Sequence, residues 1–166
     1  MGAGRNPVLP TSSSGFGFDR LAPVSRAYAS MPVAAAFNWA DCATPDASGE
    51  WYLVAFRSLL RVDADEEQLK AFDDRAFEEA ASAPGFIHYF KGPANERREC
   101  LSFCLWDSRR LARGAAGRRA HVEAVAIAHS TYDCYTLEFL RVRKRRGSLT
   151  FEFEPYDRPH AQVPAA

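Results

Sequence analysis

Hydrophobic and polar residues follow two different periods along residues 51–156, and together they predict a succession of strands and helices. Apolar runs and strict alternation of apolar with polar residues are typical of β-strands. Such runs occupy residues 51–61, 86–92, 99–106, 130–142 and 149–154. The polar stretches between 92 and 99 and between 143 and 148 are expected to be turns.

Residues 63–83 have a different period, with apolar residues every three or four positions. This is the period of an amphipathic helix, and its apolar face consists of Leu69, Phe72, Ala76 and Ala80. Asp63 and Glu66 have the spacing of a capping box at the start of this helix. The segment is therefore expected to pack one face on a sheet.

A second helix is predicted after Asp107 or Ser108, either of which can cap it. Gly114 and Gly117 are expected to divide it into a short turn and a longer piece over 118–129. The complete order is then β-α-β-β-α-β with one added strand, which predicts an α+β, ferredoxin-like split βαβ fold.

The ferredoxin-like sheet has four antiparallel strands and carries both helices on one face, so its other face has to be covered. A second copy of the chain on that face gives a dimeric α/β barrel, and we therefore expect a homodimer. The alternative cover is the N-terminal arm together with the last strand.

The remaining residues divide the chain into four parts. Residues 1–30 are punctuated by Gly, Pro and Ser and predict a flexible N-terminal arm. Residues 31–50 are more apolar and are expected to form an irregular segment that packs on the domain. The ferredoxin-like domain spans 51–156, and 157–166 form a tail.

The charge balance narrows the choice of partners. Lys and Arg total 21, as do Asp and Glu, so no net field attracts nucleic acid or an anionic membrane. No apolar run reaches the roughly 18–20 residues that span a bilayer, and no secretory leader is recognisable, so a cytoplasmic protein without membrane contact is expected.

One basic cluster, the basic tip, consists of Arg141, Arg143, Lys144, Arg145 and Arg146. It is expected to be a solvated hairpin tip, with a nucleic-acid contact as the alternative.

Motifs for several reaction classes are missing. The four cysteines lack zinc-binding spacing, and the chain contains no GxGxxG, Walker, HExxH or GxSxG sequence. Neither a metal nor a cofactor is therefore expected.

The most unusual residue of the first strand is Arg57, which interrupts the apolar run WYLVAFRSLL. A charge on a buried strand requires a partner. In a ferredoxin-like sheet the first strand lies between the third and the last, which places Glu138 on the strand beside Arg57. Two interpretations follow: a structural ion pair, or an arginine that binds a carboxylate, phenolate or phosphate and is oriented by Glu138.

Period-two alternation divides the strand residues between the two faces of the sheet. The row expected to face the helices contains Val54, Phe56, Leu101, Phe103 and Leu105. The row expected on the opposite, open face contains Ala55, Arg57, Cys100, Ser102, Cys104 and Trp106. If the open face holds a ligand, its site is expected around Arg57.

Other candidate site residues follow from the chemical properties of their side chains. His88 and His121 are candidates for proton transfer because imidazole titrates near neutral pH, so the candidate catalytic residues are Arg57, His88, His121 and Glu138. The candidate ligand-binding residues are Asn38, Trp39, Arg57, Ser102 and Trp106, in which the indoles form flat walls for an aromatic molecule. For each of them the alternative is a packing role.

Several of these segments resemble known families. Residues 51–143 resemble the antibiotic-biosynthesis-monooxygenase-like group of dimeric α/β barrels through the opening strand, the APGF turn and the Trp106-Asp107-Ser108 step. Residues 30–156 are similar to an uncharacterised family found widely in fungi, through FNW, VAFRS, HYFKGP, LSFCLWDSR, AGRRAH and FEFE. The broader group includes cofactor-independent oxygenases acting on aromatic polyketides, haem-degrading enzymes and many proteins of unknown activity.

The haem-degrading branch carries an Asn on the first strand, a second Trp and a haem-ligating His. Aligned through APGF, Arg57 occupies the Asn position, Ala115 occupies the Trp position, and His121 lies near the ligand position. The resemblance therefore implies that the chain does not degrade haem.

Three functions are compatible with these sequence features. The first is a cavity that binds a small, partly apolar molecule, with cofactor-independent monooxygenase chemistry as the reaction that the resemblance implies. The second is a non-catalytic structural or assembly module whose barrel is filled by side chains. The third is a nucleic-acid accessory protein that acts through the basic tip. Whether the chain is an enzyme is left open.

Overall fold

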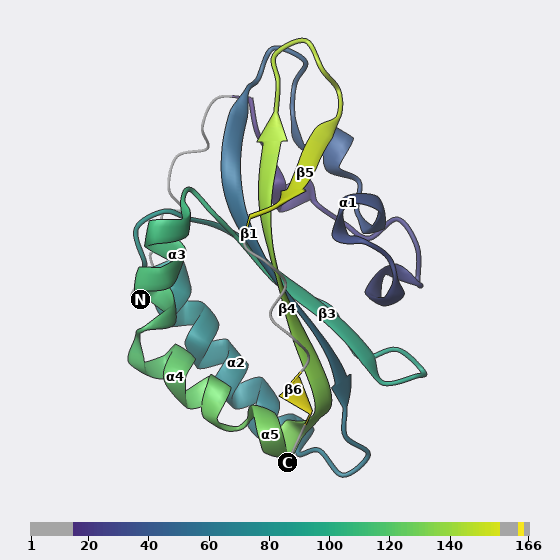
Figure 1. The fold of residues 1–166 in the computed structure, drawn as a ribbon, viewed down its shortest axis with the longest axis vertical. Helices are drawn as coiled ribbons and strands as arrows, with labels where there is room; N and C mark the ends of the chain where they lie inside the picture. The colour runs from purple at the N-terminus through teal and green to yellow at the C-terminus, as the bar shows by residue number, and fades with distance from the viewer. Residues whose placement is uncertain (1–14, 157–162, 165–166) are drawn as a thin grey trace, which may run out of the picture.

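The computed structural model describes residues 15–156 and 163–164 (Figure 1). Its main elements follow the order β1 (Gly49–Leu60), α2 (Glu66–Ala81), β2 (Phe86–Lys91), β3 (Glu99–Trp106), α3 (Arg109–Ala116), α4 (Arg119–Ala126), α5 (Ala128–Thr131), β4 (Tyr132–Lys144) and β5 (Phe151–Pro155). A short β6 (Val163–Pro164) follows. The predicted α+β, ferredoxin-like order with one added strand is confirmed.

The sheet has the strand order β2-β3-β1-β4-β5, and its neighbouring strands are antiparallel. β1 therefore lies between β3 and β4, as predicted, with Ala55 opposite Phe103 on one side and Glu138 on the other. β5 pairs with one end of β4, from Leu140 to Lys144, and β6 pairs with the other end at Cys134 and Tyr135.

Local sequence signals explain most helix boundaries. The predicted cap Ser108 accepts a hydrogen bond from the backbone N–H of Leu111 at 3.4 Å and begins α3. Gly117 ends α3 as expected, whereas Gly114 lies inside it. The predicted capping residue of α2 is wrong, because Asp65, not Asp63, accepts the bond from Gln68.

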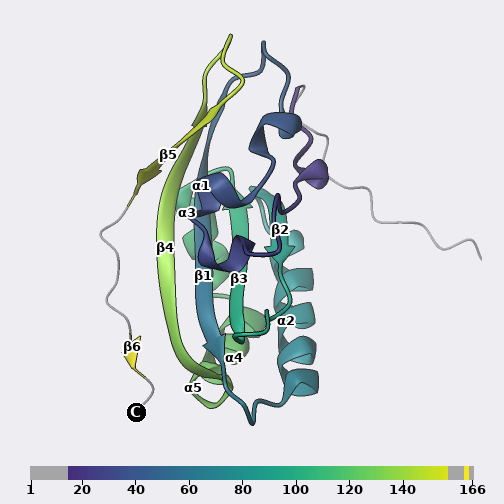
Figure 2. The ribbon, with the colours of Figure 1, turned by 90° about the vertical axis from the view of Figure 1, so that its right-hand side faces the viewer.

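Both faces of the sheet are covered, by different parts of the chain (Figures 1 and 2). Helices α2, α3 and α4 lie on one face. Residues 15–47 lie on the other and contain four short helices, η1 (Phe18–Arg20), η2 (Tyr28–Ser30), α1 (Val33–Ala36) and η3 (Trp39–Cys42). The face on which a second copy was expected is thus covered within the chain.

Residues 15–47 contribute many buried side chains to the core on their face of the sheet. Phe18 and Tyr28, which fall in the predicted flexible arm, are 6% and 9% exposed. They pack with the apolar side of the sheet, in a cluster that includes Phe37, Trp39, Trp51, Leu53, Leu101, Phe103 and Leu105. Residues 1–14 of the predicted arm and most of the predicted tail lie outside the described residues.

The predicted assignment of β3 to the two faces is wrong. Leu101, Phe103 and Leu105 face residues 15–47, and Ser102, Cys104 and Trp106 face the helices. Because Ala55 is opposite Phe103, these two residues share a face, and Arg57 shares it with them. Val54 and Phe56 of β1 face the helices as predicted, whereas hydrophobicity misassigned the rows of β3 because both faces are buried. Among the described residues, no helix is long and apolar enough to cross a bilayer.

Candidate functional site

A cavity of about 470 Å³ lies between the sheet and the helices. Strands β1, β3 and β4 contribute aromatic and apolar side chains to its wall, and α2 contributes further side chains from the opposite side. Representative lining residues are Tyr52, Phe56, Trp106, Leu137, Phe139 and Phe72. This size and composition are typical of sites for small molecules.

The sequence explains why this space is not filled. Alternate residues of the strands point large side chains toward the helices, as Tyr135, Leu137 and Phe139 do in β4. Much of the helix side of the wall is alanine, at Ala76, Ala80, Ala112, Ala115, Ala116, Ala124 and Ala128. Because an alanine side chain ends at Cβ, the helices leave a gap in front of the aromatic wall.

One polar cluster lies in this apolar wall. Tyr89 of β2 donates a hydrogen bond from its hydroxyl to Asp73 Oδ1 of α2 at 2.6 Å. Lys91 Nζ lies 2.7 Å from Asp73 Oδ2. Burial raises the pKa of Tyr89, and the neighbouring Asp73 carboxylate raises it further, so the phenol stays protonated at neutral pH.

Cys104 also lines the cavity, and its thiol is unreactive at neutral pH. Burial raises the pKa of its thiol to about 12. Since the thiolate is the reactive form of cysteine, Cys104 is a packing residue at neutral pH. In the described part of the chain, no cluster of three or more His, Cys, Asp or Glu side chains could hold a metal ion.

His121 is a lining residue of the cavity and is exposed to solvent, which places it at an opening. Glu79 fixes its backbone: the Glu79 Oε2 atom accepts bonds from the N–H groups of Ala120 at 3.0 Å and His121 at 3.4 Å. Although the residue is in contact with solvent, packing of the imidazole against the protein partly desolvates it and lowers the pKa of His121, against the opposing charge of Glu79. His121 is thus a neutral group at the rim at pH 7.

Arg57 lies on the other face and does not line this cavity. The predicted ion pair with Glu138 is present, through Arg57 Nε. The other two guanidinium nitrogens donate to backbone carbonyls of residues 15–47, Nη1 to Ala29 and Nη2 to Met31, both at 2.7 Å. Arg57 therefore holds this segment on the sheet.

His88 is on the same face as Arg57, beside Phe103. Its Nε2 atom is buried and has no hydrogen-bond partner among the described residues. Burial lowers the pKa of His88, so the ring is neutral at pH 7. It faces the same side of the sheet as Arg57 and does not line the cavity.

Asn38 and Trp39 organise residues 15–47. The Asn38 side-chain oxygen accepts a bond from the Ala22 N–H at 2.6 Å, and its amide donates to Asp41 at 2.9 Å. Trp39 is 4% exposed and donates from its indole to the Val33 carbonyl at 3.0 Å. Neither residue lines the cavity.

The structure therefore divides the predicted site residues. Ser102, Trp106 and His121 come together at the cavity, whereas Arg57, Glu138, His88, Asn38 and Trp39 lie on the opposite face. Sequence reasoning missed the Asp73 and Tyr89 pair. The available signal was the position of Asp73, four residues after Leu69 and next to Phe72 on the predicted apolar helix face.

The basic tip is largely neutralised by its neighbours. Arg141 and Arg143 pair with Glu50, and Arg145 pairs with Glu152. Lys144 was expected to be solvated, but it is 1% exposed and donates to backbone carbonyls, including that of Ala47 at 2.8 Å. Three arginines of the basic tip are thus paired with glutamates, and its lysine is buried.

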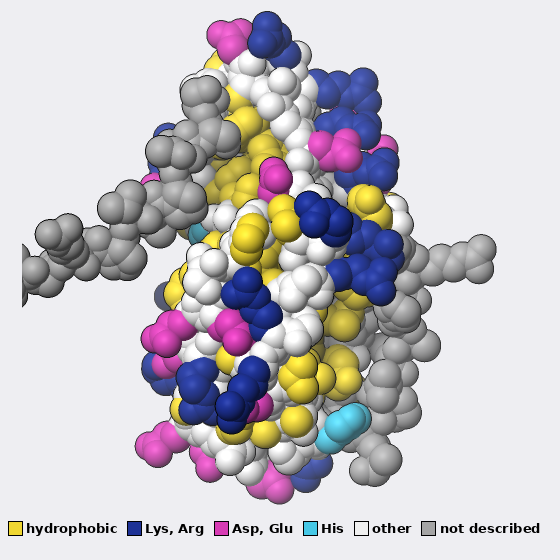
Figure 3. Space-filling view, turned by 90° about the vertical axis from the view of Figure 1, so that its left-hand side faces the viewer, with side chains coloured by type: hydrophobic (Ala, Val, Ile, Leu, Met, Phe, Trp, Pro, Cys, Tyr) yellow, Lys and Arg dark blue, Asp and Glu magenta, His cyan; other side chains and the backbone are white. Residues whose placement is uncertain are grey.

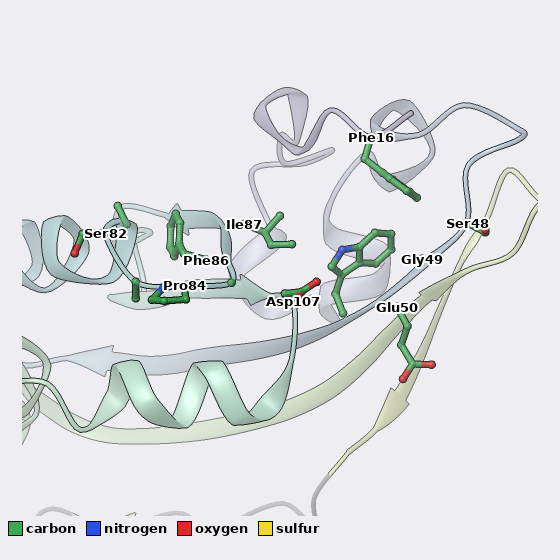
Figure 4. A pocket seen from close by; sticks show the side chains of 13 residues that line it. Phe16, Ser48, Gly49, Glu50, Ser82, Pro84, Phe86, Ile87 and Asp107 are labelled. Carbon is green, nitrogen blue, oxygen red and sulfur yellow. The ribbon is translucent and has the colours of Figure 1, made fainter. Parts of the chain in front are cut away.

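A second pocket, of about 730 Å³, lies at the end of the sheet near Trp51 (Figure 4). Its acidic side chains do not converge, since Figure 4 shows Glu50 pointing away from Asp107. Glu50 is already bound to Arg143 at 2.8 Å.

On the helix side of the molecule, apolar side chains are visible between the charged ones (Figure 3). The cavity between sheet and helices is the better candidate site, because its polar groups lie inside an apolar wall.

Most of the chain is similar to a known protein family. Residues 12–155 match the model of a protein family described as PB2B2.08-like. No curated protein matches the chain.

Several solved structures are similar over little more than half of the chain. One is a proposed antibiotic biosynthesis monooxygenase from Nitrosomonas europaea, with 12% identity and a TM-score of 0.49 over 55% of this chain and 88% of that one. Another is SnoaB, a cofactor-independent oxygenase from Streptomyces nogalater, with 13% identity and a TM-score of 0.44 over 58% and 94%. A third is a dimeric ferredoxin-like protein of unknown function from Thermobifida fusca, with 14% identity and a TM-score of 0.42 over 58% and 91%.

Proposed function

The chain belongs to the PB2B2.08-like family, and we propose that it binds a small, partly apolar molecule in the cavity between its sheet and its helices. The observation that carries this proposal is the cavity itself. Its volume of about 470 Å³ lies within the roughly 300–1,000 Å³ of small-molecule sites. Its wall is aromatic, and few polar groups interrupt it.

The resemblance of residues 51–143 to the antibiotic-biosynthesis-monooxygenase-like group extends the proposal to a reaction, the cofactor-independent oxygenation of the bound molecule. His121 is the candidate to move a proton in that reaction, because it is the predicted catalytic residue that lines the cavity. Arg57, Glu138 and His88 support the fold on the other face.

The proposal is tested first by native mass spectrometry of freshly purified protein, which reports a retained ligand and the oligomeric state together. Binding of a fluorescent apolar probe is then compared between Ala76→Phe and Ala71→Phe. Both positions lie on α2, but Ala76 lines the cavity and Ala71 is exposed.

We expect Ala76→Phe to weaken probe binding at least about tenfold, since its ring occupies the space that the probe needs. Ala71→Phe is expected to bind like the wild type. Equal binding by the two variants, with both folded, would show that the probe binds elsewhere and would overturn the proposal.

A non-catalytic structural module is the second candidate. It has one observation in its favour, which is that residues 15–47 fill the face opposite the helices with aromatic side chains. This candidate predicts no retained ligand and no effect of Ala76→Phe beyond stability. The homodimer remains a prediction, and it would have to use a surface other than the covered face.

A further inference from the structure

We propose that the molecule bound in the cavity carries a hydroxyl or N–H donor on an otherwise apolar ring, and that this donor binds at Asp73 and Tyr89. The inference rests on the proposed function, because it names the chemical class of the ligand of the same cavity. It differs from one of the two sequence interpretations of Arg57, in which that arginine binds an anionic group.

The hydrogen bonding of the pair determines what it offers to a ligand. A phenol has one hydrogen, and Tyr89 gives it to Asp73 Oδ1 at 2.6 Å. What remains on Tyr89 is an acceptor oxygen, and each carboxylate oxygen of Asp73 retains a further acceptor site. The pair therefore presents acceptors to the cavity, and a donor on the ligand completes its hydrogen bonding.

Neighbouring residues hold this pair in place. The ring of Tyr89 stacks on Phe77 with 5.4 Å between centroids. Lys91 holds the other Asp73 oxygen, Oδ2, at 2.7 Å. The Asp73 side chain is 25% exposed, so it is partly withdrawn from competing water. The high pKa of Tyr89 keeps its hydrogen on the phenol, which preserves this arrangement at neutral pH.

The charges around the cavity disfavour an anion at this position. Lys91, the cation nearest to Asp73, is engaged with that carboxylate. The other basic lining residues, Arg113 and His121, are exposed. An anionic group placed against Asp73 would face a carboxylate, and like charges repel strongly where water is partly excluded.

The test compares three probes with the same ring system at pH 7, by calorimetric titration of the full chain: 2-naphthol, 2-methoxynaphthalene and 2-naphthoate. For the wild type we expect 2-naphthol to bind roughly tenfold more tightly than 2-methoxynaphthalene, since a hydrogen bond to a charged acceptor is worth at least this factor. 2-Naphthoate is expected to bind most weakly.

Asp73→Asn replaces the charged acceptor by an amide of the same shape, and we expect the preference for 2-naphthol to fall to about twofold. Asp74→Asn is the matched control, because Asp74 is the next residue of α2 and its carboxylate pairs with Lys70 outside the cavity. It should keep the wild-type preference. Unchanged affinity for 2-methoxynaphthalene shows that Asp73→Asn is folded.

The outcomes separate this inference from the proposed function. Equal wild-type affinities for 2-naphthol and 2-methoxynaphthalene, both abolished by Ala76→Phe, would retain the cavity as a binding site and refute the donor. Tightest binding of 2-naphthoate would also refute it. Failure of all three probes to bind would overturn the proposed function and this inference together. The wild-type comparison decides the matter even if Asp73→Asn does not fold.

Discussion

Replacing Arg57 by Met is expected to destabilise the protein by about 3 kcal/mol. The substitution keeps an aliphatic side chain of similar length but removes the bonds from the guanidinium to the carbonyls of Ala29 and Met31. Hydrogen bonds made by charged groups contribute about 1.5–3 kcal/mol each. The ion pair with Glu138 adds little beyond these bonds, because the two side chains are partly buried (22% and 31% exposed) and the cost of desolvating the pair offsets most of its Coulomb attraction. Two bonds at the lower value give the estimate.

Thermal denaturation measures this loss. For a chain of this size, 1 kcal/mol shifts the midpoint by about 2–4 °C, so the expected fall is about 6–12 °C. Hydrogen exchange of residues 15–47 should accelerate more than exchange in α2, because the lost bonds hold that segment to the sheet. Glu138→Gln is the control, since it leaves both carbonyl bonds in place and should cost less than about 1 kcal/mol.

An Arg57→Met variant with wild-type stability and unchanged exchange in residues 15–47 would refute this reasoning. If that variant also lost a ligand retained by the wild type, Arg57 would serve the ligand and not the fold. Comparable losses of stability from Arg57→Met and Glu138→Gln would assign the effect to the ion pair instead of the two carbonyl bonds.

Three further predictions concern buried polar groups. Lys144→Met should lower the free energy of unfolding by about 1–3 kcal/mol in urea, because it leaves backbone carbonyls without their donor; an unchanged midpoint would contradict this. Cys104 and Cys42, with pKa values raised by burial to about 12 and about 11, should resist iodoacetamide at pH 8 until the protein is unfolded, which peptide mass spectrometry detects. Burial lowers the folded pKa of His88 below its ordinary value of 6.5, so its contribution to stability is complete above pH 6.5 and is lost as the pH falls toward the folded pKa. His88→Gln should flatten the fall of stability between about pH 7 and pH 5, and an equal slope in both proteins would count against a buried neutral ring.

The sequence by itself determined the order and type of the main elements of residues 51–156. Hydrophobic periods are local, and they were sufficient to find the strands, the helix that carries Leu69 and Phe72, and the cap at Ser108. The pair of Arg57 with Glu138 was also predictable, because the ferredoxin-like order places their strands side by side.

Only the tertiary structure decided which face the two rows of β3 occupy and where the cavity lies. Alternation shows which residues of a strand share a side, but it does not show whether that side faces the helices or residues 15–47. The register decides this, because it places Phe103 opposite Ala55 and therefore on the same face of the sheet. The bonds of Arg57 go to main-chain carbonyls, which every residue has and no side-chain pattern marks. The pairing of Tyr89 with Asp73 likewise depends on how a helix sits on a sheet, and that distance exists only after the chain has folded.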